Sequence, residues 1–227
     1  MSLEWLDVTA VNIHEINVGL DLYKESFPEE VREPQQTFYD SMRKAEVATG
    51  QTYRFIVGKE EGKVVSFATG HYFSSINAGF IVYIVTDPHL RSKGIGAETL
   101  RALEERLHYD ARQAGYHEIA DILLETEHKD CVHTMLEKEE CDKRALFFSR
   151  NGYSIMKDIV YVQPPLHQGE EIVPLHLYSK NVTTTVSDIN AMIYEIYYQK
   201  YYRINGIDKA TLNQCLQQMN IHRMIES

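Results

Sequence analysis

Three consecutive stretches in the first half of the chain are rich in apolar residues, and the third, Phe80–Val85, is apolar on both alternating faces, as expected of a central strand. β-Branched and aromatic residues dominate each stretch, and the connections between them are short and contain glycine or polar residues. This combination favours an antiparallel meander. The pattern predicts strands at Thr52–Lys59, Lys63–Phe73 and Gly79–Thr86, with a turn at Glu60-Glu61-Gly62.

A helical period of apolar positions follows the third strand. Gly96, Leu100, Leu103 and Leu107 predict a helix from Gly94 to Ala114, ended by Gly115. Weaker patterns predict the remaining elements up to residue 179. In chain order these are a strand or lead-in at Val8–His14, helices at Asn17–Phe27 and Gln36–Val47, a strand at Ile119–Glu125, a polar insertion at His128–Cys141, a helix at Asp142–Arg150, and strands at Tyr153–Val162 and Ile172–Tyr178.

Residues 180–227 have a different pattern. One face of a predicted helix carries Ile189, Ile193 and Tyr197, with Ser187 or Asp188 as its cap, and Thr211–Met219 predicts a second helix. Five tyrosines fall within nine residues, which favours packing, either on the chain's own sheet or on a second copy of the protein, over a lid on the acceptor site. A homodimer through this segment is therefore a hypothesis. We therefore expect a domain at residues 1–179 and, at 180–227, a helical arm too small to fold alone.

The composition narrows the classes of partner. The formal net charge is −10, which argues against nucleic acid or an anionic membrane surface and suits a cationic substrate. We find neither an apolar run long enough to span a bilayer nor the pattern of a signal peptide. The three cysteines lack the spacing of a disulfide scaffold. We therefore expect a cytoplasmic protein.

The segment Arg91-Ser-Lys-Gly94-Ile-Gly96 opens the long helix. Its glycines leave successive backbone N–H groups uncovered at the positive end of the helix dipole, and Arg91 and Lys93 add positive charge. The segment therefore predicts a pyrophosphate site. A P-loop would end in Gly-Lys-Ser/Thr, and a Rossmann fingerprint would place its first glycine at the strand end; neither pattern is present. The alternative interpretation is that Gly94 and Gly96 are ordinary turn and packing residues with no phosphate ligand.

With its flanking strand, Asp-Pro turn and helix, this segment resembles the acyl-CoA-binding motif of the GNAT acetyltransferase superfamily. A second match is Leu124–Glu127 followed by Asp142–Tyr153. The resemblance covers about residues 5–179. It implies an α/β fold with an α+β layout, in which a mixed, mostly antiparallel central sheet is flanked by helices and the C-terminal helical extension lies outside the motif. It also implies transfer of acetyl from acetyl-CoA to a primary amine of a small molecule or peptide, by direct attack in a ternary complex.

The resemblance also assigns residues to roles. The Val85 N–H would hold the thioester carbonyl as an oxyanion donor. Glu125 is the first candidate for the base, with a solvated strand-end carboxylate as the alternative, and Tyr83 and His71 are weaker candidates. Glu29 and Glu30, together with Tyr83, would face the cationic acceptor. The alternatives are a solvated charge pair or the first turn of a helix for the two glutamates, and packing on the sheet for Tyr83 and His71. The residues assigned to acetyl-CoA are Ile84, Val85, Thr86, Arg91, Ser92, Lys93, Gly94, Ile95, Gly96 and Ala97.

Three departures from the family pattern leave a second function open. Phe148 stands where many members place a tyrosine that protonates the departing thiolate, Asp142 replaces the usual asparagine, and residues 128–141 are inserted. Phe148 raises the alternative of a non-catalytic acyl-CoA-binding sensor or regulatory module. The histidines and cysteines of the insertion match no common zinc motif, so we expect no metal.

Overall fold

The computed structural model describes residues 3–26, 32–47, 50–167, 169–181 and 183–226. The chain divides into two compact units, Met1–Ile119 and Ala120–Ser227. The predicted division at residue 179 stays a prediction. Within the described residues, none of the helices combines the length and the apolar character needed to cross a bilayer.

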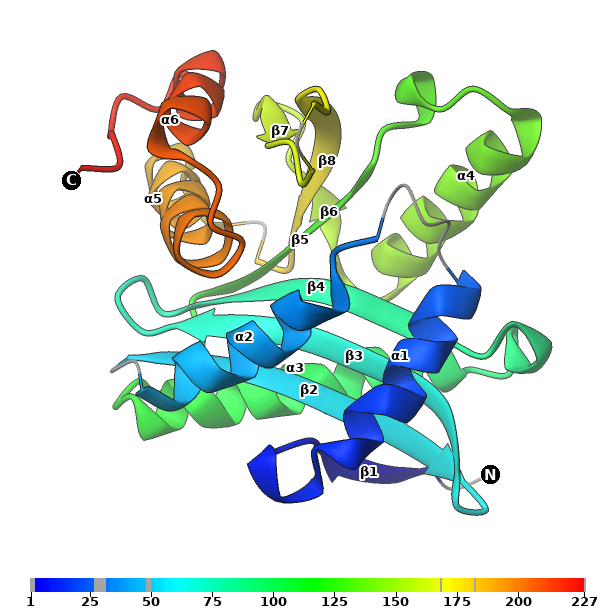
Figure 1. Cartoon of the computed structure of the whole chain (residues 1–227). Helices are drawn as coiled ribbons and strands as arrows, with labels where there is room; N and C mark the ends of the chain where they lie inside the picture. The colour runs from blue at the N-terminus through cyan, green and yellow to red at the C-terminus, as the bar shows by residue number, and fades with distance from the viewer. Residues whose placement is uncertain (1–2, 27–31, 48–49, 168, 182, 227) are drawn as a thin grey trace. The chain divides into compact units, whose positions relative to one another are not determined.

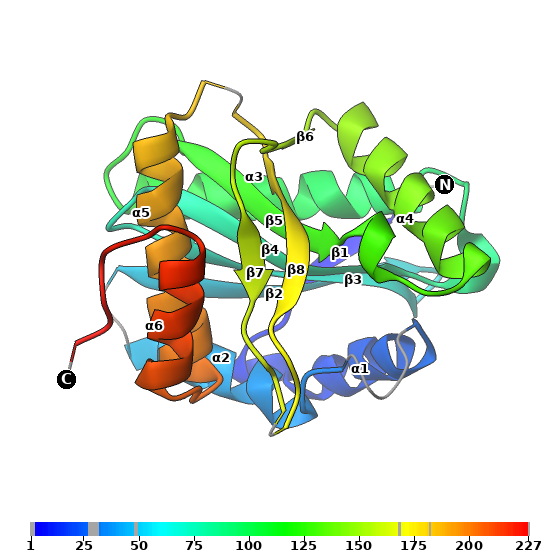
Figure 2. The same ribbon diagram turned by 90° about the horizontal axis from the view of Figure 1, so that it is seen from above.

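The first unit is an antiparallel sheet with helices on both faces (Figure 1). Its strands pair in the order β1-β2-β3-β4. Helices α1 and α2 cover one face and α3 covers the other, as the view from above shows (Figure 2). The elements are β1 (Glu4–Asp7), a 3-10 turn (Ala10–Asn12), α1 (His14–Ser26), α2 (Gln35–Val47), β2 (Gln51–Glu60), β3 (Lys63–Phe73), β4 (Ala78–Thr86), a 3-10 turn (Pro88–Leu90) and α3 (Ile95–Gln113).

The predicted meander and long helix are confirmed within one or two residues at each end. Glu61 and Gly62 both have positive φ, of 49° and 79°, so they form the tight two-residue turn that the right-handed twist of a hairpin favours. Helix α3 buries the predicted leucine stripe, and Gly115 follows it with φ of 93°. Of the two alternatives for Val8–His14, the strand was wrong: β1 lies before Val8, and a Thr9–Asn12 capping box forms a 3-10 turn that leads into α1.

The second unit places strand β8 between β5 on one side and β6 and β7 on the other. All three pairings are antiparallel. The mostly antiparallel sheet expected from the sequence is therefore confirmed. The elements are β5 (Asp121–Glu127), a 3-10 turn (Lys129–Cys131), α4 (Met135–Arg150), β6 (Ser154–Ile155), β7 (Tyr161–Gln163), β8 (Val173–Ser179), α5 (Val186–Ile196), a π-helical segment (Tyr197–Ile204) and α6 (Lys209–Gln218).

Three boundaries in the second unit correct the predictions. Helix α4 begins at Met135, not Asp142, because Thr134 and Glu137 form a capping box; half of the expected polar insertion is therefore helix. The strand expected at Tyr153–Val162 is two short strands, separated by a turn in which the Ile159 N–H donates to the Met156 carbonyl. The cap of α5 is Thr185 and not either of the two residues expected.

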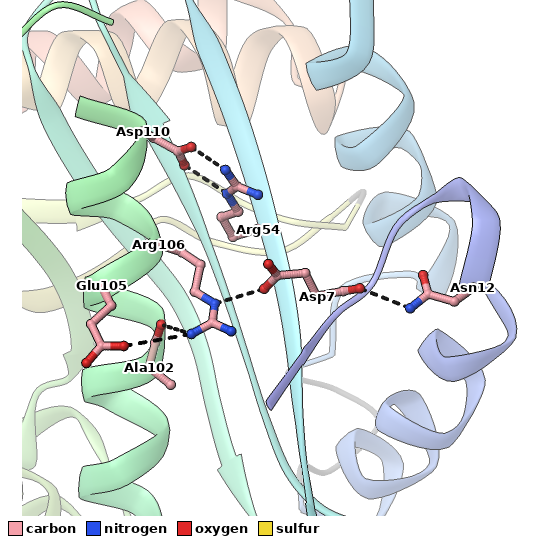
Figure 3. A network of polar contacts seen from close by, with 7 residues as sticks. All are labelled: Asp7, Asn12, Arg54, Ala102, Glu105, Arg106 and Asp110. Atoms are coloured by element: carbon pink, nitrogen blue, oxygen red, sulfur yellow. Dashed lines mark hydrogen bonds and ion pairs between the residues drawn. The ribbon is translucent and has the colours of Figure 1, made fainter. Parts of the chain in front are cut away.

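A polar network fixes α3 against the strands of the first unit (Figure 3). Arg54 on β2 donates from two of its nitrogens to both carboxylate oxygens of Asp110 on α3, and Thr52 Oγ1 donates to the same carboxylate at 2.7 Å. Arg106, one turn earlier on α3, donates from Nε to Asp7 on β1 at 2.9 Å. Because Asp110 is only 3% exposed, its charge depends on these partners.

Replacing Asp110 with alanine is expected to lower the free energy of unfolding by about 3–5 kcal/mol, since the Arg54 charge would lose its partner in a largely buried site. Urea unfolding of the purified chain measures this loss. Glu105→Ala is the matched control on the same helix, because Glu105 is exposed and its nearest cation, Arg106, lies 3.9 Å away. It should change stability by less than about 1 kcal/mol. Equal losses in the two variants would contradict the role of the network.

Candidate active site

The predicted anion-binding loop lies at the N-terminus of α3. Gly94 is the N-cap residue, with φ of 86°, and within the part of the chain that the structure describes no side chain caps the first turn of the helix. The space where a Gly94 Cβ would stand is open to at least 4 Å. Gly94 and the three residues before it are exposed. The structure therefore brings together an open left-handed glycine, an uncapped helix start and the cations Arg91 and Lys93.

The loop leading to this helix is held by its own hydrogen bonds. The Asp87 N–H donates to the Val65 carbonyl at 2.8 Å, and Asp87 Oδ1 accepts from the His89 N–H at 2.8 Å. Ser92 takes a positive φ of 65°, which is uncommon for a residue with a side chain. These hydrogen bonds of Asp87 fix the path of the chain from the end of β4 toward α3.

Strand β4 contains an irregularity that the sequence did not predict. Thr69 of β3 pairs with Tyr83, but the next residue, Gly70, pairs with Ile81, so Val82 is an extra residue on β4. Such a bulge disrupts the ladder locally and re-aims neighbouring groups, and bulges are common next to active sites. Val85 is buried beyond the bulge, with Ile84 and Thr86 half-buried on either side. The oxyanion role of Val85 stays a prediction.

The candidates on the acceptor side have different positions. Tyr83 packs among aromatic side chains, with its ring centroid 5.0 Å from that of Tyr23 and 5.5 Å from that of Phe38. The Tyr23 hydroxyl donates to the Tyr83 hydroxyl at 3.2 Å and accepts from the Glu33 N–H at 2.8 Å. His71 is 1% exposed and stacks on Phe73. Glu29 and Glu30 lie outside the described residues.

Burial changes the acid–base chemistry of Tyr23. Burial, with a smaller contribution from the charge of Glu33, raises its pKa to about 12. Since the unfolded side chain ionises near pH 10, stability is fully present below that pH and falls as the pH rises toward 12. We expect Tyr23 alone to remove about 1 kcal/mol of the free energy of unfolding between pH 9 and 11. Urea unfolding should show a smaller alkaline loss for Tyr23→Phe than for the wild type; equal losses would contradict this assignment.

In the second unit, Glu125 is held by three side chains. Its Oε2 accepts from the Tyr161 hydroxyl at 2.6 Å, and its Oε1 accepts from Gln163 Nε2 at 2.9 Å. The Tyr201 hydroxyl lies 2.9 Å from Oε1 and 3.1 Å from Oε2. Glu125 is half-buried and lies two residues before the end of β5. It is therefore an ordered, partly exposed carboxylate, and its role as the base stays a prediction.

The two tyrosines stay protonated donors at neutral pH. Burial, and after it the negative charge of Glu125, raises the pKa of Tyr161 and of Tyr201 well above the ordinary value. Sequence reasoning proposed Glu125 but missed all three of its partners. The repeated tyrosines near residue 200 were a sign that this face is buried, but no local signal named Glu125 as the group they meet.

Comparisons with known proteins identify the family and the fold. The model of the Acetyltransferase (GNAT) family matches residues 17–130, half of the chain. This chain belongs to the GNAT family. A GNAT-family protein from Bacteroides thetaiotaomicron shares 20% identity with a TM-score of 0.66, and the match covers 90% of this chain and 99% of the other. No curated protein matches the sequence.

Two further solved structures have the same fold at lower similarity. A GNAT-family protein from Desulfovibrio desulfuricans shares 15% identity with a TM-score of 0.54, over 78% of this chain and 98% of its own. The aminoglycoside 6'-N-acetyltransferase from Enterococcus faecium shares 17% identity with a TM-score of 0.52, over 80% and 98%. At these identities the likeness shows the fold alone. The GNAT-like sheet with additional C-terminal helices, expected from the sequence, is confirmed.

Phe148, which stands where many GNAT members place a tyrosine, is packed among aromatic side chains. It is 9% exposed, and its ring contacts those of Phe147, Tyr153 and Tyr178. The side chain is part of the apolar contact between α4 and β8 and supplies no proton. Asp142, which replaces the usual asparagine of the family pattern on the same helix, pairs with Lys129 at 2.5 Å on the surface.

The histidines and cysteines of residues 128–141 are spread from the N-cap of a 3-10 turn to the second turn of α4. His128 packs against His176, with ring centroids 4.1 Å apart and the ring planes tilted by 34°. Cys131 is exposed, whereas Cys141 is buried, and neither is in a disulfide. In the described part of the chain, no group of three or more histidine, cysteine or acidic side chains is arranged to hold a metal ion.

Proposed function

We propose that this GNAT-family chain moves the acetyl group of acetyl-CoA to a primary amine by direct attack in a ternary complex. The open start of α3 carries the proposal: Gly94 in the left-handed conformation, an uncapped first turn and two exposed cations in a chain of net charge −10. Backbone N–H groups at a helix start bind phosphate, and the diphosphate of coenzyme A has the matching charge. The loop of residues 91–97 would hold that diphosphate.

Two residues would act on the reacting groups. The Val85 N–H would stabilise the charge that develops on the thioester oxygen, and Ile84 and Thr86 would line the pantetheine arm. Glu125 would take the proton from the attacking amine, which must be neutral to attack. Its fixed orientation supports this role, because a general base has to present a defined lone pair to its proton. No cysteine is assigned as an acyl carrier.

The acceptor would be a cationic amine on a small molecule or peptide. The acidic balance of the chain favours a positively charged partner, and Glu29, Glu30 and Tyr83 are the residues we propose to face it. The expected cytoplasmic location and the homodimer through the arm stay predictions. Nucleic acid and membrane remain outside the expected partners.

Two measurements test the function. Calorimetry of the full chain should show acetyl-CoA binding, and thiol release from acetyl-CoA should occur with at least one amine of a panel containing spermidine, kanamycin and a lysine peptide. Absence of binding would overturn the proposal. Binding without release would favour the second candidate, an acyl-CoA-binding regulatory module. The buried Phe148, which has no hydroxyl to protonate the thiolate, is the observation that favours that candidate.

A further inference from the structure

The C-terminal arm contacts Glu125 directly. Tyr201 belongs to the π-helical segment after α5, is 0% exposed, and places its hydroxyl within hydrogen-bond distance of both Glu125 oxygens. The family model ends at residue 130, far before this tyrosine. A residue outside the matched region therefore contacts the carboxylate that we propose as the base.

The π-helical segment gives Tyr201 this position. Hydrogen bonds in such a segment join residues five apart, as the Asn205 N–H to the Lys200 carbonyl shows at its end. Within the segment, Tyr197 and Tyr201 present their rings to each other at 5.2 Å. The Tyr197 hydroxyl donates to the carbonyl of Val162 on β7, between the two β7 residues that bind Glu125. Short π segments are frequent at functional sites.

The three donors have different effects on the carboxylate. Tyr161 and Gln163 each hold one oxygen from β7. The Tyr201 hydroxyl lies at nearly equal distances from the two oxygens, so its contact opposes rotation of the carboxylate about its Cγ–Cδ bond. Without Tyr201, only the separate contacts from Tyr161 and Gln163 would hold the two oxygens in place. The contact from the arm thus completes the orientation of Glu125.

We propose that Tyr201 is a positioning residue for Glu125, and that the C-terminal arm is therefore a required part of the acetyl-transfer site. This inference rests on the proposed function. The hydroxyl contacts both carboxylate oxygens and also Gln163, so its described contacts are to Glu125 and to another residue that holds Glu125. Removing the hydroxyl leaves the buried ring and its contact with Tyr197 in place.

Tyr201→Phe tests the proposal through a split between kcat and KM. With an amine that the wild type acetylates, we expect kcat to fall about tenfold, as loss of a hydrogen bond to a charged group predicts, while KM for acetyl-CoA stays within about twofold. Tyr198→Phe is the matched control: Tyr198 lies on the same segment, is half-exposed, and stacks on Tyr194. It should leave both constants within about twofold.

A double variant separates positioning from a general structural effect. If Tyr201 acts through Glu125, Tyr201→Phe should cause no further loss of kcat in a Glu125→Gln background. A further tenfold loss there would overturn the proposal, as would an unchanged kcat in the single variant of an active wild type. If the wild type itself neither binds acetyl-CoA nor releases thiol, the proposed function fails, and that result differs from either outcome of the variants.

Discussion

Glu125→Gln is expected to lower kcat for acetyl transfer by roughly 10²–10⁴-fold, the range typical for losing a general base, with acetyl-CoA affinity unchanged. Glutamine keeps the size of the side chain and an oxygen for the surrounding donors, but it cannot take a proton from the attacking amine. Thiol release under saturating acetyl-CoA measures kcat, and calorimetry measures the affinity for the cofactor.

Glu127 provides the control for this variant. It lies two residues further along β5, is exposed, and pairs with Arg144 on the surface. Glu127→Gln removes the same charge from the same strand, so a change in net charge alone would affect both variants equally. We expect its kcat to stay within about twofold of the wild type. If Glu125→Gln retains wild-type kcat, Glu125 is not the base, and water would have to take the proton.

The parts of the fold that could be predicted are those that a local pattern specifies. Strands β2, β3 and β4 are runs rich in β-branched and aromatic residues with short connections between them, and α3 carries its leucines at helical spacing. The turn at Glu61 and Gly62 and the left-handed Gly94 follow from glycine at defined positions. Each of these signals lies within a few residues of the structure that it specifies.

A capping box in the sequence marks the start of α4, but the many charged residues around it obscure the helical pattern. Only Cys141 and Phe148 of its 16 residues are buried, so the helix has almost no apolar period to detect. Thr134 and Glu137 nevertheless form a capping box, whose spacing can be read in the sequence. The capping box therefore specifies the helix start at Met135 from local sequence alone.

The surroundings of Glu125 could not be predicted in this way. Its partners lie 36, 38 and 76 residues away in the chain. Which tyrosine meets the carboxylate depends on the register of β7 on β8 and on the wider turn of the π-helical segment, and neither is specified by its own few residues. The same holds for the bulge at Val82, a β-branched residue in a run that otherwise looks like regular strand.

Gly94→Val is expected to weaken acetyl-CoA binding by about 10–100-fold. The side chain would enter the open space over the helix start and force a β-branched residue into a backbone with φ of 86°, so backbone N–H groups would lose their contact with the diphosphate. The loss of one or two hydrogen bonds to a charged ligand sets the size of the effect. Calorimetry with acetyl-CoA measures it.

Gly115→Val separates the loss of the site from backbone strain. Gly115 follows the opposite end of the same helix, also has positive φ, of 93°, and also has no atom within 4 Å of an added Cβ. Both variants should therefore lose similar stability in urea unfolding, because the strain is alike. Only Gly94→Val should lose affinity for acetyl-CoA. If the two variants bind equally well, the diphosphate is not held at the start of α3, and the assignment of residues 91–97 fails together with the proposed function that depends on it.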